Sequence, residues 1–444
     1  MRIRSLLLAV LAISVLGLPA TAVAKPPPDP EPAEPTDPTG VIASANIEVL
    51  STIPEPSVVS ARFRDTVMYV SGLTGLTTYD ISAPANPVRL GRLALPHFEN
   101  EDVDLGGDIL LISNDAAEST GILYVVDISD PTNPTLLSQL AMGGNPLLGG
   151  PGHTASCVDE CRFAWVTDGG GIRVVDLRDP ANPADLGVQP VATGGLVVHD
   201  VQRDGDGLYW VAGFDGTAAY RIPAGYDGSN LGELVARTDA AGRSRYIETL
   251  GLDDGSSYND YIHHNSMRRG GSDTVYVTEE DYTRPGCRGA GSFQRWRLPL
   301  DEQGQPTGED LTPIDMWSTE LAGEGADASG VCSAHYFDER KGLIAQGWYQ
   351  QGLRLLDVQG AEIRQVGYYI TPDVLAWGAY YPPTDRSGEL VYVLDHTRGI
   401  DVLRVHRPKR NKDMPTVTAP ILPEWRISTE LKASPTYGYA CLLT

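Results

Sequence analysis

Residues 121–134 read GILYVVDISDPTNP, and shortened copies of this phrase stand about fifty residues away on either side. The earlier copy is GLTTYDISAPANP at 75–87, and the later one is GIRVVDLRDPANP at 171–183. A fixed period of this size indicates stacked copies of one supersecondary unit. The period therefore predicts a repeat architecture before any single residue is considered.

The DPxNP end of the phrase is typical of a turn. Asp and Asn side chains bond to nearby backbone amides, proline presets its own φ, and the residue before proline is driven into an extended conformation. We therefore interpret Asp127, Asp130 and Asn133, together with the equivalent residues of the later copy, as turn-builders rather than catalytic groups.

Short β-rich segments repeat around each copy of the phrase. Segments rich in β-branched and aromatic residues, which we interpret as second strands, stand at 68–72, 109–114, 163–169, 208–213, 274–280, 343–349 and 390–395. The third strands follow at 75–80, 121–127, 171–176, 216–222, 293–298, 352–357 and 399–405. Seven four-stranded antiparallel units predict an all-β fold, a seven-bladed β-propeller. Six or eight blades stay open because the fifth unit is irregular.

The two ends of the repeat array complement each other. The last unit stops after its third strand at Val405, whereas the strand-like segment NIEVLST at 46–52 precedes the first unit. Pairing the two would supply the missing fourth strand and remove an open sheet edge. We expect this N-terminal strand to close the ring.

The phrase also carries a family resemblance. VVDISDPTNP and its weaker copies resemble the LVIVD-repeat family of secreted bacterial propellers over roughly residues 45–406. The motif departs from the family pattern after residue 216, since Arg221 stands where Asp is expected. The resemblance implies a seven-bladed propeller outside the cytoplasm, and it implies no reaction.

The N-terminal sequence predicts export. Arg2 and Arg4 precede a short apolar run, and Ala22-Val23-Ala24 supplies the small residues of a cleavage site. We predict a signal peptide at 1–24, a Pro- and acid-rich linker at 25–44, the propeller at 45–406 and a tail at 407–444. The expected location is extracytoplasmic, either secreted or periplasmic in a bacterium. An uncleaved membrane anchor is the alternative, and no later segment is apolar enough to span a bilayer.

The formal net charge of −24 disfavours some partners. Nucleic acids and anionic lipids need clustered Lys and Arg, and the one basic cluster, at 407–412, lies outside the repeats. The sequence thus predicts no nucleic-acid partner, no membrane span after signal cleavage, and a monomer. An unidentified small molecule, glycan or protein remains as the ligand.

The five cysteines suit an oxidising compartment. Cys157 and Cys161 flank Val158-Asp159-Glu160, which we interpret as a hairpin turn that allows a disulfide. A CxxxC metal site is the rival interpretation. Cys287 and Cys332 would then pair across neighbouring repeats, which leaves Cys441 over.

The heads of the first strands carry the sharpest chemical signal. When the units are aligned, one equivalent position holds Glu101, His153, His199, His264 and His335 in units two to six. First strands line the channel of a propeller, so these side chains should converge at one mouth. Imidazole and carboxylate ligands suit a transition metal such as Cu, Zn or Fe. Structural histidines bonded to turns are the alternative interpretation.

Three functions therefore stay open. The first is binding of a ligand or partner at the channel mouth without catalysis. The second is a transition-metal-dependent oxidoreductase or hydrolase, and the third is a structural cell-surface module. Whether the protein is an enzyme is not decided by the sequence, which contains no GxSxG, HExxH or phosphate-binding loop.

Two other features have simpler interpretations. RDGDG at 203–207 resembles part of a calcium loop, but its place between two strands indicates a hairpin turn. Segments 224–262 and 299–331 break the regular spacing, and we interpret them as insertions on the side of the ring where the histidines open.

Overall fold

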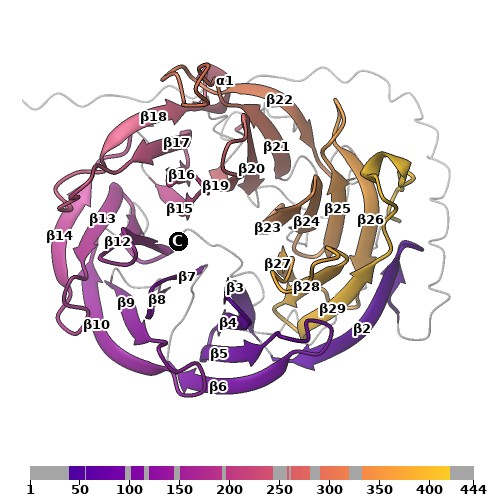
Figure 1. The fold of residues 1–444 in the computed structure, drawn as a ribbon, viewed down its shortest axis with the longest axis horizontal. Helices are drawn as coiled ribbons and strands as arrows, with labels where there is room; N and C mark the ends of the chain where they lie inside the picture. The colour runs from indigo at the N-terminus through magenta and orange to yellow at the C-terminus, as the bar shows by residue number, and fades with distance from the viewer. Residues whose placement is uncertain are drawn as a thin grey trace, which may run out of the picture. The chain divides into compact units, whose positions relative to one another are not determined.

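The computed structural model describes residues 40–55, 57–95, 102–114, 120–144, 151–192, 197–243, 258–259, 262–280, 291–319 and 333–420. Seven antiparallel sheets follow one another in this part of the chain. Figure 1 shows them as blades around an axis, with the first strand of a blade innermost and the fourth outermost. The protein is a seven-bladed β-propeller, as the sequence predicted.

The first three blades have four consecutive strands each. Blade one contains β3 (Val58–Arg64), β4 (Val67–Gly72), β5 (Gly75–Asp80) and β6 (Val88–Ala94). Blade two contains β7 (Val103–Gly106), β8 (Ile109–Asn114), β9 (Thr120–Asp127) and β10 (Thr135–Gly143). Blade three contains β11 (Ala155–Val158), β12 (Phe163–Asp168), β13 (Gly171–Asp176) and β14 (Ala184–Gln189).

The next two blades follow the same order. Blade four contains β15 (Val198–Arg203), β16 (Tyr209–Gly213), β17 (Gly216–Arg221) and β18 (Glu233–Arg237), followed by the short helix α1 (Ala240–Arg243). Blade five contains β19 (Ile262–Arg268), β20 (Thr274–Glu280), β21 (Ser292–Arg297) and β22 (Thr312–Trp317). Strands β18 and β22 fall within the segments predicted as insertions, so those insertions are partly regular fourth strands.

The last two blades use strands from both ends of the described chain. Blade six contains β23 (Phe337–Arg340), β24 (Leu343–Gly347), β25 (Leu353–Asp357) and β26 (Arg364–Ile370), with β1 (Ile42–Ala43) added at its edge. Blade seven contains β27 (Ala376–Tyr380), β28 (Leu390–Asp395), β29 (Gly399–Val405) and β2 (Ile47–Pro54). A 3₁₀ turn, η2 (Asn411–Asp413), follows.

The ring is closed by the N-terminal strand. Strand β2 pairs antiparallel with β29, placing Ile47 opposite Val405 and Thr52 opposite Asp401. This is the closure that the unclaimed segment at 46–52 predicted. The pairing of β1 with β26 was not predicted, because a two-residue strand leaves no periodic signal.

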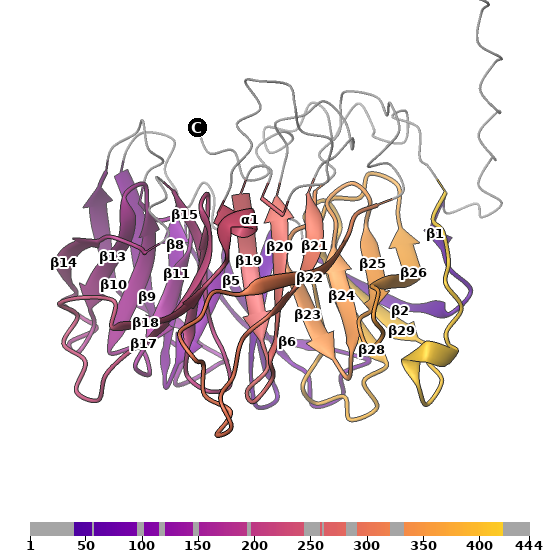
Figure 2. The same ribbon diagram turned by 90° about the horizontal axis from the view of Figure 1, so that it is seen from above.

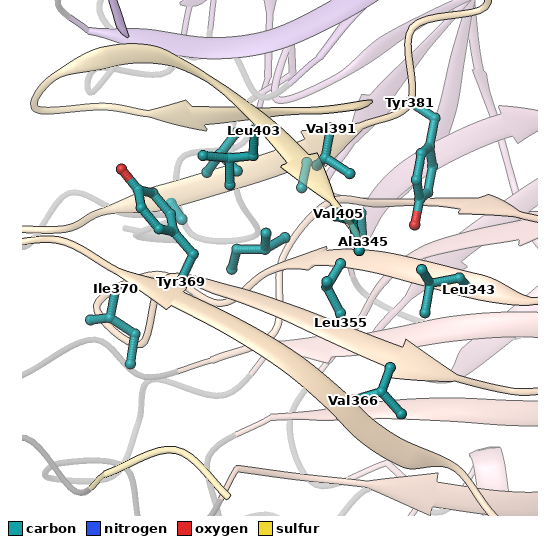
Figure 3. Close-up of a cluster of buried hydrophobic side chains, with 14 of the residues drawn as sticks. Leu343, Ala345, Leu355, Val366, Tyr369, Ile370, Tyr381, Val391, Leu403 and Val405 are labelled. Atoms are coloured by element: carbon teal, nitrogen blue, oxygen red, sulfur yellow. The ribbon is translucent and has the colours of Figure 1, made fainter. Parts of the chain in front are cut away.

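Apolar side chains between neighbouring blades form the core. Figure 3 shows the cluster between blades six and seven, where Leu355 and Val366 face Val391 and Leu403. The second strands are covered on both faces, and all residues of FAWVTD in β12 are buried. Outer strands are mostly exposed, as β14 is.

The repeated acids build turns. The Asp127 carboxylate accepts a 2.8 Å hydrogen bond from the Ser129 amide, and the Asp130 carboxylate accepts one of 2.9 Å from the Thr132 amide. In the RDGDG segment, Asp204 accepts hydrogen bonds from the Leu208 amide and from the buried Arg268 guanidinium. The Asp204 carboxylate is therefore already hydrogen-bonded to donors of the protein, as expected for a residue that builds a turn.

Candidate metal centre

A β-bulge sets the position of the candidate ligands. In four inner strands the register shifts at one residue near the strand's start: Val59 in β3, His199 in β15, His264 in β19 and Trp377 in β27. A bulge re-aims its extra side chain out of the regular alternation. The equivalent residue of blade seven is thus Trp377, two to three positions before the Ala379 or Tyr380 that sequence alignment of the units suggested.

The structure brings four histidines of blades three to six into one row. The Nε2 atoms of His153 and His199 lie 3.0 Å apart. The rings of His199 and His264 are 4.2 Å apart between centroids, and those of His264 and His335 are 4.1 Å apart. Four residues spread over more than 180 positions of sequence therefore form a row in which each contacts the next. Inter-blade hydrogen bonds hold this row, since the Thr154 hydroxyl donates to the His199 carbonyl.

A glutamate completes the group. Glu280 ends β20, beside the first residues of β19, and its Oε2 atom lies 3.6 Å from Nε2 of His199. The Tyr349 hydroxyl donates a 2.5 Å hydrogen bond to the other oxygen, Oε1. Glu280 was not predicted, because it stands at the end of a second strand and not at the head of a first strand. Comparing the ends of the second strands, where TVYVTEE closes on two acids, would have found it.

These side chains have the spacing of a coordination shell. One potential ligand atom from each of His199, His264 and Glu280 lies within 4.8 Å of the others, and all three residues are fully buried. Two ligands bound tetrahedrally at 2.0–2.1 Å lie about 3.3 Å apart. The 3.0 Å and 3.6 Å separations around His199 bracket this value. His199, His264 and Glu280 therefore fit a single transition-metal ion, while His153 lies outside this group, with its Nε2 atom 3.0 Å from that of His199.

Two neighbouring histidines differ in their hydrogen bonding. The Nδ1 atom of His335 lies 2.6 Å from the Trp377 carbonyl, which can only accept, so Nδ1 carries the proton and Nε2 keeps its lone pair. Both ring nitrogens of His263 are engaged, one by the Thr217 hydroxyl and one by the Tyr258 carbonyl. Burial lowers the pKa of His263 to about 4, so this ring is neutral and structural.

Some of the other predicted site residues lie in the described part of the chain and some lie outside it. Glu101, Cys287 and Cys332 lie outside the described residues. Cys157 and Cys161 are joined in a disulfide across the turn between β11 and β12. This leaves no thiolate at either position to serve as a metal ligand.

Below the histidine row, a polar network crosses the channel. The Arg62 guanidinium of blade one donates to Asp102 of blade two and, at 2.8 Å, to the Gln202 side chain of blade four. The Gln202 amide donates 2.9 Å hydrogen bonds to both Asp102 and Asp200. We call these four residues the channel plug. Asp102 and Asp200 stand one residue beyond the histidine register of their strands, and Arg62 and Gln202 stand three residues beyond it. The plug therefore lies next to the histidine row, along the inner strands.

Burial raises the pKa values of the two carboxyl groups of the plug. Burial, followed by the nearby Asp102 carboxylate, raises the pKa of Asp200 to about 8. The pKa of Asp102 is also raised by burial, while Arg62 opposes that effect. The protonated form of Asp200 is therefore favoured at neutral pH, which limits the repulsion between the two carboxyl groups.

Comparison with known proteins agrees with this fold. Residues 116–141 match the model of the LVIVD repeat. Over 81% of this chain and 99% of the other, the structure is similar to the β-propeller domain of Cps50 (Swd1) from Myceliophteria thermophila, with a TM-score of 0.55 and 11% identity. A search of curated proteins found no match. The fold and the motif together define the class, a seven-bladed β-propeller that carries the LVIVD repeat.

One structural observation bears on membranes. None of the helices in the described part of the chain has the length and apolar character needed to span a bilayer.

Proposed function

We propose that the protein binds one transition-metal ion at His199, His264 and Glu280, and that this ion is its reactive centre. The observation that best supports this proposal is the convergence of these three side chains, from blades four and five, with ligand atoms within 4.8 Å of one another inside a fully buried site. Structural histidines need only hydrogen-bond partners in the protein, such as the two that His263 has, and need no such convergence.

The ligand set favours iron. Two histidines and one carboxylate form the facial triad of non-haem Fe(II) oxygenases, whereas imidazole also binds Cu and Zn. Iron or copper would support oxidation or oxygenation of a substrate, and zinc would support hydrolysis. We propose an iron-dependent oxidoreductase, with copper and zinc as the alternatives that metal analysis separates.

This chain's own residues would prepare the site. Tyr349 holds Glu280 through its hydrogen bond, and Tyr336 packs its ring 4.7 Å from that of His264. Trp377 contacts His335 on the other side, at 5.1 Å between ring centroids. An aromatic shell of this kind limits water access and keeps the donor groups oriented.

Elemental analysis of the purified chain tests the proposal. About one equivalent of iron, copper or zinc per chain is expected, either as isolated or after anaerobic reconstitution. The double variant His199→Ala/His264→Ala should lose the ion, while His406→Ala, at an exposed position, should keep it. A wild-type chain that stays free of all three metals, or a double variant with full occupancy, contradicts the proposal.

We also propose that the protein works outside the cytoplasm. The disulfide between Cys157 and Cys161 supports this location, because such bonds persist in oxidising compartments. The N-terminal sequence at 1–24 has the features of a signal peptide. N-terminal sequencing of the exported protein tests both, with Lys25 expected as its first residue.

A further inference from the structure

A cavity borders the channel plug. Its volume is about 210 Å³, and it is lined by residues of β3, β15, β16, β19, β23 and β27 and of adjoining turns, with Arg62 and Gln202 of the plug in its wall. Its lining residues on the inner strands follow the histidine register, as Asp338 follows His335. The cavity therefore lies further along the inner strands than the histidine row, and the proposed metal ligands are not among the described residues that line it.

Asp338 supplies the cavity with a carboxyl group. Its oxygens each accept one backbone hydrogen bond, from the Glu339 and Tyr381 amides, at 2.7 and 3.0 Å. A carboxylate can accept about four hydrogen bonds, so both oxygens keep acceptor capacity. Among the described residues no Lys, Arg or His lies within ion-pair distance of Asp338. Burial raises its pKa to about 6.

Two buried donors in the wall have no hydrogen-bond partner among the described residues. They are the Ser266 hydroxyl and the Nη2 atom of Arg268. Both residues line the cavity and both are at least nine-tenths buried. An enclosed polar group without a partner is destabilising, so a ligand or water that bonds these donors is favoured.

The arginines of the wall already have carboxylate partners among the described residues. Arg62 is paired with Asp102, Arg268 with Asp204 at 2.7 Å, and Arg203 with Glu160 at 3.6 Å. These pairs disfavour an anionic ligand, and the guanidinium groups offset the attraction of the Asp338 carboxylate for a cationic one. The ligand that suits this wall is uncharged and both donates and accepts hydrogen bonds.

Apolar and aromatic faces complete the wall. Phe63, Met267, Phe337 and Tyr380 line the same space as the polar groups. Carbohydrates present C–H faces to aromatic rings and hydroxyl groups to carboxyl, amide and guanidinium groups. The volume lies below the 300–1,000 Å³ range of pockets for drug-sized ligands, which indicates a ligand of one ring.

We propose that this cavity binds a neutral polyhydroxylated molecule the size of one sugar ring, with Asp338 accepting from ligand hydroxyls and Ser266 and Arg268 donating to them. Tyr336 lines this cavity and also packs against His264, so the site adjoins the proposed metal centre. Binding at this site does not require a bound metal.

Calorimetric titration of the full chain with D-glucose, D-galactose, D-mannose and myo-inositol tests the proposal. At least one should bind in the millimolar range expected for so small a ligand. Asp338→Asn, which removes one acceptor while keeping shape, should weaken that binding at least about tenfold. Asp108→Asn, an exposed acid on blade two, is the matched control and should bind like wild type. The double variant His199→Ala/His264→Ala should also bind normally, which separates this site from the metal centre.

Three results would overturn the assignment. They are no binding by any of the four compounds, unchanged affinity in Asp338→Asn, and binding of ethanolamine in place of all four neutral compounds. If Asp338→Asn does not fold, Ser266→Ala and Tyr380→Phe serve instead, and unchanged affinity in both has the same meaning.

Discussion

The Tyr349 hydroxyl donates a 2.5 Å hydrogen bond to Oε1 of Glu280, and both side chains are fully buried. Glu280 belongs to blade five, whereas Tyr349 follows β24 in blade six. The bond therefore crosses a blade interface and leaves Oε2 of Glu280 on the side of His199. Tyr349 is a positioning residue for the proposed metal ligand.

Removing this hydroxyl should weaken metal binding. Groups that orient a ligand typically contribute 10- to 100-fold to affinity, so Tyr349→Phe should raise the metal dissociation constant by about that factor. Competition with a chelator measures the constant. The control is Tyr392→Phe, whose hydroxyl donates to the Pro84 carbonyl away from the histidines and should not affect the metal. Equal constants for both variants would show that Tyr349 does not position Glu280.

The carboxyl pair of the plug predicts a pH dependence of stability. Folding raises the pKa of Asp200 from 3.8 to about 8, so between these values the folded state holds a proton that the unfolded state has released. The free energy of unfolding should thus fall as pH rises through this window, by up to about 1.4 kcal/mol per pH unit.

Denaturant unfolding of Asp200→Asn at pH 6 to 8 tests this dependence, because the amide mimics the protonated acid. The free energy of unfolding of the variant should increase relative to that of wild type as pH rises. Asp108→Asn, with its exposed side chain, should run parallel to wild type. If the stability of Asp200→Asn changed with pH in parallel with wild type, a group other than Asp200 would be responsible for the pH dependence.

Ring closure by β2 predicts different outcomes for two N-terminal truncations. Removing residues 1–39 leaves β1 and β2 in place and should keep the melting temperature. Removing residues 1–54 deletes β1 and β2 and exposes the edges of β26 and β29, so the chain should melt at a lower temperature and associate through the open edge of β29. Differential scanning calorimetry and light scattering report these outcomes, and equal behaviour of both truncations would argue against closure by β2.

The disulfide at the tip of blade three predicts a modest effect. Closing so short a loop stabilises a protein by about 2 kcal/mol in the chain-entropy model. Cys157→Ser/Cys161→Ser should lose about that amount, and reductant should lower wild-type stability without affecting the variant. Peptide mapping without reductant should recover the two cysteines in one cross-linked fragment, and free thiols at both would refute the bond.

The blades were predictable because each one repeats the same chemistry. Asp127 and Asn133 mark a turn, apolar runs mark the strands, and comparing units places His153, His199, His264 and His335 at one register. The prediction used only local pattern and period, and these survive in the first three units. It needed no knowledge of how the blades pack.

Other parts of the site depend on geometry that a sequence pattern does not carry. Trp377 occupies the histidine register of blade seven only because a bulge separates Ala376 from Gly378. Glu280 reaches His199 from a second strand, and Arg62 reaches Gln202 across the channel over 140 residues of sequence. Contacts between side chains of different blades become visible only once the ring is built.

The pairing of β2 with β29 also sets the order in which the molecule can form. Thr52 and Asp401 are hydrogen-bonded across 349 positions of sequence. During synthesis the N-terminal strand must wait, without its partner, until nearly the whole chain has been made. Closing so long a loop is entropically costly and slow. The final, ring-locking step is therefore post-translational, and a nascent chain cut short at any earlier blade would leave that first strand free to pair with another molecule.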